Sequence, residues 1–371
     1  MKSKAARGLF AGVIAGTVAF AFAEAVRPRP GPATLIDWDE IRELALRRLR
    51  DDAGLTERRR NELGELYNRL AAEVEAPLLE VVGSLPPETR LPAFQALDRR
   101  TWLELNVGIL QQALEPALAA AKRLPNSRAV ELGRAGLDRY VAFILVFLAR
   151  RVLGQFDPQL LGHKLIGEEA ALGDLYLVEP NIETWERQAA LPGEELRRWL
   201  ILHEATHAWQ FAAHPWLRRH LNSMLQEVVR AATGGEQRDT WSQLVAMTVG
   251  LPRQWAVVRR MQATMTLIEG YSNLVMNIVG RRLLPSFEQL ESAYRKRSGQ
   301  RSALEVAFWK LTGLDLKLQQ YLRGEAFCTA VYQAHGMQAL NLAWQSEDTL
   351  PRLEELSDPE RWYRRVSRVA G

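Results

Sequence analysis

The stretch WLILHEATHAWQFAAHPWLRRHL, from Trp199 to Leu221, holds two histidines four residues apart with a glutamate directly after the first. Residues at this spacing lie on the same face of an α-helix, so His203 and His207 can direct two imidazole nitrogens at one point. Their neighbours are almost all apolar, which is typical of a buried helix, and buried polar side chains are costly without partners. We therefore predict a helix that binds zinc through both histidines, with a water molecule facing Glu204. The alternative is a histidine pair that is satisfied within a core.

A catalytic zinc site needs a third protein ligand and leaves one position open to water. Glu269, in TLIEGYSN, is the best candidate, because it stands in an apolar run where an unpaired carboxylate would be costly. Gly270 follows it and permits a neighbouring helix to approach closely. We expect Asn273, one turn further on, to hold a ligand histidine by its second ring nitrogen. The alternative for Glu269 is a buried ion pair with an arginine. Weaker candidates for the third ligand are Glu227, Glu305 and Glu325.

The composition describes a globular chain without an internal disulfide framework. Its 371 residues are 47% hydrophobic, enough for one large or two ordinary domains with a sizeable core. The net charge is +4, but the arginines are scattered over many segments, which indicates solvated helix faces and no nucleic-acid partner. Cys328 is the single cysteine, so a disulfide framework and a cysteine-ligated zinc site are excluded.

The N-terminal segment, residues 1–26, differs from the rest. Three basic residues precede an uncharged apolar stretch over residues 8–23, slightly shorter than the roughly 20 residues of a membrane-spanning helix. We expect a membrane anchor or an export signal, and so a membrane-associated or exported protein rather than a cytoplasmic one. The alternative is a Gly/Ala-rich helix on the protein's own surface. Residues 27–36, rich in proline, then form a stiff linker.

The remainder, residues 37–371, has mostly helical periodicity. We divide it into N-terminal helices over 37–150, a zinc-site core over 151–345 and a C-terminal helix within 346–371. One stretch, Gly173 to Ile182, is predicted to be a β-strand. An exposed edge of this strand could hold an extended peptide by main-chain hydrogen bonds. The predicted fold is therefore mainly α, with a small β element before the histidine helix.

Five blocks together resemble a largely uncharacterised bacterial family of zincin-like metallopeptidases, some of whose members are associated through gene neighbourhood with deazaflavin coenzyme biosynthesis. The resemblance covers residues 37–345 and implies a mostly helical zincin core that uses zinc. It implies that His203 and His207 are ligands, that Glu204 is catalytic and that Glu269 is the third ligand. Phe156 stands where the family has tyrosine. The blocks are VLGQFDP (152–158), LYLVEPNI (175–182), LILHEATHAWQF (200–211), IEGYSN (268–273) and K-x-x-Q-Y-x-x-G-x-x-F (317–327).

The sequence thus predicts a zinc-dependent hydrolase, in particular a peptidase acting on a peptide or protein, with Glu204 as general base. Tyr321, on a face shared with Lys317, is the first candidate for the oxyanion donor, ahead of Tyr271 and His335. The alternative is a non-catalytic scaffold that keeps the fold. An enzyme of deazaflavin synthesis is a third possibility, but no phosphate-binding glycine loop supports it.

Overall fold

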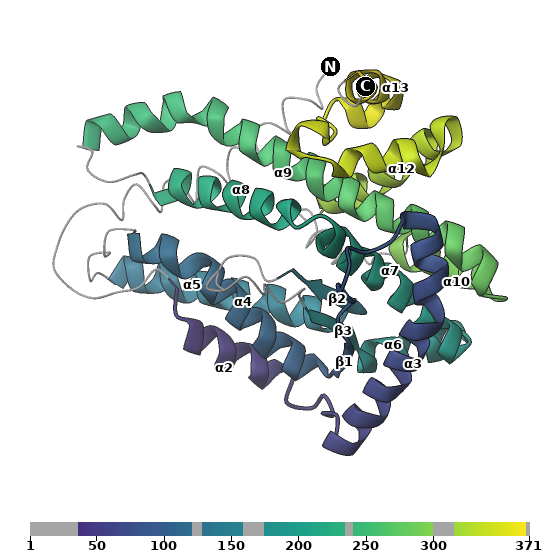
Figure 1. Ribbon diagram of the computed structural model, residues 1–371. Coiled ribbons are helices and arrows are strands. Elements are labelled where there is room, and N and C mark those ends of the chain that lie inside the picture. The colour runs from purple at the N-terminus through teal and green to yellow at the C-terminus, as the bar shows by residue number, and fades with distance from the viewer. Residues whose placement is uncertain (1–35, 121–127, 159–173, 234–239, 300–314, 369–371) are drawn as a thin grey trace. The chain divides into compact units, whose positions relative to one another are not determined.

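The computed structural model describes residues 36–120, 128–158, 174–233, 240–299 and 315–368 (Figure 1). Over these residues the fold is mainly α with one small sheet, as the sequence predicts. The predicted N-terminal anchor and nearly all of the linker lie outside the described residues. Among the helices that the structure does describe, none combines the length and apolar character needed to cross a bilayer.

The chain divides into two compact units. The first unit contains the described residues within 1–52, 100–150 and 232–234. Its helices are α2 (Trp38–Arg48), α4 (Arg99–Ala120) and α5 (Arg128–Ala149). Asp37 caps α2 by accepting a hydrogen bond from the Glu40 amide, and the Asp37 amide donates to Asp138 of α5 at 3.1 Å, which joins the two helices.

The second unit contains the histidine helix, the sheet and the helices that enclose them. In this unit α7 contacts α3 and α9, and α9 runs beside α12 (Figure 1). Its elements are α3 (Glu57–Val82), β1 (Phe94–Leu97), β2 (Gly154–Asp157), β3 (Asp174–Val178), α6 (Glu179–Ala189), α7 (Gly193–Ala213), α8 (Trp216–Thr233), α9 (Thr240–Leu283), α10 (Phe287–Gly299), α12 (Asp315–Asn341) and α13 (Pro359–Ser367).

The sheet has the strand order β1-β3-β2, with β3 parallel to β1 and antiparallel to β2. The predicted strand over 173–182 is therefore too long: β3 ends at Val178 and α6 begins at the next residue. Pro180 lies in the first turn of α6, where its missing amide hydrogen costs nothing. The peptide-binding role predicted for the edge of this strand is also wrong, because β3 is central and paired on both sides. Among the described strands, β2 lies at an edge of the sheet, and it contacts α7.

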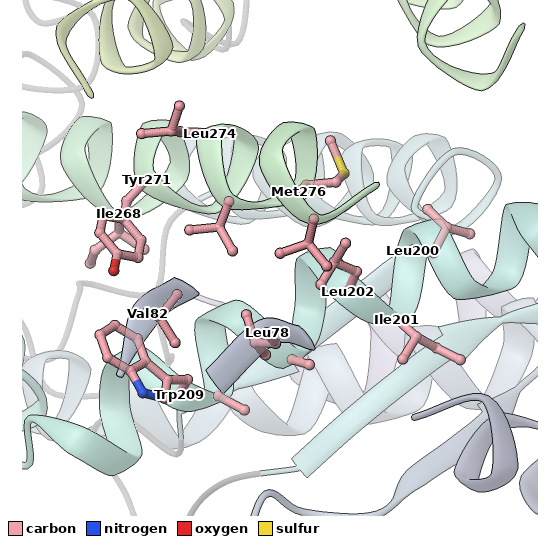
Figure 2. Packing of buried hydrophobic residues seen from close by; sticks show 14 of the residues in the cluster. Leu78, Val82, Leu200, Ile201, Leu202, Trp209, Ile268, Tyr271, Leu274 and Met276 are labelled. Carbon is pink, nitrogen blue, oxygen red and sulfur yellow. The ribbon is translucent and has the colours of Figure 1, made fainter. Parts of the chain in front are cut away.

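Burial of α7 on nearly all sides organises the second unit. Apolar side chains of α3, α7 and α9 interdigitate around it, including Leu78, Leu202 and Met276 (Figure 2). Each fully buried side chain of this size contributes about 1.5–3 kcal/mol to folding before the entropy cost is subtracted. The histidine helix therefore has a position fixed by packing along its length.

A buried ion network connects the sheet to α7. Glu179, which follows β3, is fully buried and pairs with Arg197 of α7 and with the hydroxyl of Tyr67 on α3. Arg197 also donates to Glu186 at 2.8 Å, so its charge is shared by two carboxylates. Because a buried charge is costly unless it is paired, these contacts fix how β3 enters the helical layer.

Two glycines bring α9 and α12 into backbone contact. A Cβ placed at Gly270 would overlap the backbone of Gly324, and a Cβ at Gly324 would overlap the carbonyl oxygen of Thr266. The sequence expected a close approach at Gly270, and the structure identifies α12 as the helix that makes it. Gly270 directly follows Glu269, so this contact fixes the position of Glu269 on α9 relative to α12.

Replacing Gly324 by alanine is expected to destabilise the protein, because the two helix backbones must separate to admit the methyl group. Such overpacking costs about 1–3 kcal/mol, measurable as a lower midpoint in urea unfolding. Gly136→Ala is the matched control, since Gly136 is an exposed residue of α5 with open space around it. Alanine there should be neutral or stabilising by about 0.5–1 kcal/mol. Equal effects of the two substitutions would contradict the role of the glycine contact.

Candidate metal centre

His203 and His207 of α7 converge with Glu269 of α9, as the sequence predicts. The two Nε2 atoms are 3.2 Å apart, and Oε2 of Glu269 lies 3.8 Å from Nε2 of His203 and 3.6 Å from Nε2 of His207. Within the described residues, this is the group of histidine and acidic side chains that could hold a metal. Their side chains are 16%, 10% and 15% exposed, so the cluster is largely buried but still reachable from solvent.

The chemistry of this donor set fits zinc. Three atoms separated by 3.2, 3.6 and 3.8 Å can all lie about 2.0–2.2 Å from one point, which is the range of zinc bonds to histidine nitrogen and carboxylate oxygen. Two imidazoles and one carboxylate form the protein ligand set of a catalytic zinc site, which keeps one position open. Glu204 stands next to His203 on the same helix and is free of any ligand role in this set.

The second ring nitrogen of His207 is held by two residues that were not predicted from the sequence, Gln210 and Ser272. Nδ1 donates to Oε1 of Gln210 at 3.0 Å, and the hydroxyl oxygen of Ser272 lies 3.1 Å from the same nitrogen. A proton on Nδ1 leaves the lone pair of Nε2 directed at the cluster. Gln210 in turn donates to the carbonyl of Ile268, which ties α7 to α9.

Asn273 was expected in that supporting role, but the described residues contain no hydrogen bond from it to either histidine. The helical period explains the difference. Ser272 is three residues after Glu269 and faces α7, whereas the next residue is rotated away by a further 100°. Gln210, three residues after His207, carried a recognisable signal, because it is a polar side chain on the same face of the apolar helix.

The two histidines have opposite charge preferences without a metal. Burial, together with the neighbouring His207, lowers the pKa of His203 to about 3, so this ring is neutral. Burial also opposes a charge on His207, but hydrogen bonding to Glu269 and the charges of Glu269 and Glu204 outweigh it and raise the pKa of His207 to about 9. The cluster therefore holds one proton in the position where a cation would lie.

Glu204 lies between α7 and the edge strand β2. Burial raises the pKa of its carboxyl group to about 7, against weaker opposing effects of the charge on His207 and of a hydrogen bond from the Phe156 backbone amide. A Cβ at Gly154 would lie only 2.6 Å from Oε1 and 2.9 Å from Cγ of Glu204. Gly154 thus leaves the space that the glutamate occupies, a role that no local feature of VLGQFDP revealed.

Two of the three candidate oxyanion donors, Tyr271 and His335, are held by other residues of the protein. The hydroxyl of Tyr271 donates to Asn341 at 2.7 Å inside the core, and His335 pairs with Glu360 at 2.5 Å and stacks on Tyr363 of α13. Both therefore have structural partners, which removes them from consideration as oxyanion donors. Tyr321 belongs to α12, but its side chain lies outside the described residues, so its predicted role stays a prediction.

The three weaker candidates for the third ligand are not brought to the cluster. Glu227 is exposed on α8, and Glu325 accepts a hydrogen bond from Asn277 at 3.1 Å. Glu305 lies outside the described residues. Of the four glutamates considered from the sequence, Glu269 is the one whose carboxylate meets both histidines.

The donor set and its adjacent glutamate are those of a metallohydrolase. The chain belongs to the family of zincin-like metallopeptidases, whose profile it matches over residues 36–363. It is also similar to a protein from Chloroflexus aurantiacus whose crystal structure is described as a provisionally assigned hydrolase with a novel fold. The two share 37% sequence identity over 90% of this chain and 99% of that one, with a TM-score of 0.67.

No curated protein matches the chain. The family and the structural neighbour support a hydrolase and confirm the predicted family and fold. The family also implies a metal, typically zinc. Neither comparison concerns deazaflavin synthesis, so that association remains an expectation of the sequence.

Zinc binding to the purified protein is expected to release a proton. At about pH 8 His207 carries a proton, because its pKa is raised to about 9, and it must lose this proton before Nε2 can bind a metal. The apparent zinc affinity should therefore rise about tenfold per pH unit up to about pH 9 and level off above it. Calorimetric titration in two buffers of different ionisation enthalpy gives the number of protons released.

His203→Ala and Glu269→Ala serve as controls for the ligand set. Each removes one of the three donors, so each should abolish tight, stoichiometric zinc binding while leaving the helical circular dichroism intact. Zinc uptake by the wild-type protein without proton release at about pH 8 would contradict the charge state assigned to His207.

Proposed function

We propose that the protein is a zinc-dependent peptidase in which His203, His207 and Glu269 hold the ion and Glu204 is the general base. The observation that carries this proposal is the convergence of two histidine nitrogens and one carboxylate oxygen beside a second, non-ligating carboxylate. Membership of the metallopeptidase family supports the same conclusion.

Glu204 is suited to proton transfer by its environment. Its pKa, raised to about 7 by burial, lies near neutral pH, where a carboxyl group can both accept and return a proton. A zinc ion held by the three ligands supplies a Lewis acid that polarises a carbonyl group and lowers the pKa of a water molecule. Glu204 takes a proton from the attacking water as the new carbon–oxygen bond forms. It then donates that proton to the leaving nitrogen as the carbon–nitrogen bond breaks.

The position of β2 at the edge of the described sheet supports an extended peptide as the substrate. β2 pairs with β3 on one side, while the Phe156 amide points to the other side and reaches Glu204. The Phe156 amide is taken by Glu204, and we expect the other main-chain groups on this side of β2 to hydrogen-bond a substrate strand. A peptide held there would have its backbone carbonyls next to the metal ligands. Tyr321 remains the residue proposed to donate a hydrogen bond to the developing oxyanion.

Glu204→Gln is expected to keep zinc and to lose hydrolysis, because the amide cannot accept the proton of the attacking water. The loss should be about 10²- to 10⁴-fold in turnover of a peptide library. Zinc content by elemental analysis should match the wild type at about one ion per chain. Wild-type turnover by this variant would remove Glu204 as the general base. Full zinc occupancy with no turnover by the wild-type protein would instead favour the scaffold alternative.

Gly154→Ala tests the contact between β2 and Glu204. The added methyl group would lie 2.6 Å from Oε1, so the carboxylate must move away from the cluster. We expect turnover to fall about 10²-fold, since misplacement of a catalytic group by about 1 Å has this effect, while zinc content stays unchanged. Gly64→Ala on α3 is the matched control, because its new methyl group meets only one atom, at 4.0 Å. Undiminished turnover by Gly154→Ala would show that Glu204 does not need this space.

A further inference from the structure

Gln210 of α7 connects two of the candidate metal ligands through the two ends of its amide group. Its Oε1 lies 3.0 Å from Nδ1 of His207, and its Nε2 donates to the carbonyl oxygen of Ile268 at 3.0 Å. Ile268 directly precedes Glu269 on α9. Gln210 is completely buried, so water does not compete for either end. One amide group therefore joins the helix that carries both histidines to the helix that carries the carboxylate.

The carbonyl group of Ile268 determines which way this amide is turned. A carbonyl oxygen can only accept a hydrogen bond, so the group that faces it at 3.0 Å must be the NH2 end of Gln210. Turning the amide over would bring two oxygen atoms together, which repel each other. Oε1 of Gln210 therefore faces His207 as an acceptor. It follows that Nδ1 of His207 carries a proton and that Nε2 is the nitrogen that can bind a metal.

Ser272 strengthens this arrangement without giving it a direction. Its hydroxyl oxygen lies 3.1 Å from Nδ1 of His207 and 3.1 Å from the carbonyl oxygen of Ile268 in its own helix. A hydroxyl group can both donate and accept, so it fits either tautomer of the histidine. Gln210, by contrast, has a donor at one end and an acceptor at the other. The amide is therefore the group that carries the direction of the network from α9 to His207.

We propose that Gln210 is a positioning residue, through which the backbone of α9 sets the tautomer of His207 and holds that ring in register with Glu269. This inference rests on the ligand set of the proposed function and assigns what aligns its two helices. Donors that are aligned in advance need not be ordered when an ion arrives, which favours binding. Loss of an outer partner of this kind lowers metal affinity about 10- to 100-fold.

Gln210→Met removes both hydrogen bonds of the amide with little change in volume. The variant should fold, because Ser272 stays within reach of both groups that lose a partner, Nδ1 of His207 and the carbonyl of Ile268. Gln210→Asn is the second variant. It keeps the amide group but is shorter by one methylene group, so it cannot reach His207 and Ile268 at the same time.

Thr206→Val is the matched control. Thr206 directly precedes His207 on α7 and is completely buried, and its hydroxyl donates to the carbonyl of Leu202 in the same helix at 2.7 Å. The substitution removes a buried hydrogen bond within α7 and leaves the link to α9 in place. Urea unfolding of each variant measures its loss of stability, which separates a general loss from an effect on metal binding.

The test is a titration of the purified full-length proteins with cobalt(II), which accepts the same nitrogen and oxygen donors as zinc and reports its geometry by visible absorption. NMR of the bound imidazole N–H protons follows the tautomer. The wild type and Thr206→Val should bind cobalt with equal affinity and equal spectra, and the His207 N–H proton should exchange slowly with water. Gln210→Met and Gln210→Asn should bind about 10- to 100-fold more weakly, with a changed spectrum and a fast-exchanging proton.

Three outcomes would contradict the proposal in different ways. Wild-type affinity, spectrum and proton exchange in the folded Gln210 variants would overturn the role of Gln210 and leave the ligand set intact. An equal loss in Thr206→Val would also overturn it, because the effect would then follow from the loss of any buried hydrogen bond in α7. Failure of the wild type to bind cobalt or zinc would overturn the proposed function, and this inference with it.

Discussion

Burial of α7 between α3, α9 and the sheet is the constraint on which the rest of the structure depends. A helix enclosed on nearly every side cannot expose its polar residues to water, so each of them needs a partner within the protein or a ligand. His207 has Gln210 and Ser272 on one ring nitrogen and the cluster on the other. Glu204 has the backbone of β2. The candidate site is the set of groups that this packing leaves facing one another.

The supporting contacts come from elements that are distant in the sequence. The glycine contact between α9 and α12 sets the position of Glu269, and the pairing of Glu179 with Arg197 joins the sheet to α7. Both contacts are intolerant of change, the first because two backbones touch and the second because the charges are buried. They lie outside the cluster itself, yet they determine whether its three donor atoms can meet.

The edge strand β2 connects the proposed chemistry with proposed substrate recognition. Its glycine leaves room for Glu204, and the Phe156 amide on its outer side binds the same carboxylate. A short strand can position both groups because alternate residues face opposite sides and successive residues advance by about 3.3 Å.

The sequence by itself determined the relation of His203, Glu204 and His207, because spacing along a helix fixes which side chains share a face. It also indicated Glu269, since a carboxylate in an apolar run needs a partner, and the mainly helical fold. Only the tertiary structure decided that Ser272 and Gln210, not Asn273, hold His207, and that β2, not β3, lies at the edge of the described sheet. These contacts depend on how separate elements pack, and no local periodicity encodes the partner across an interface.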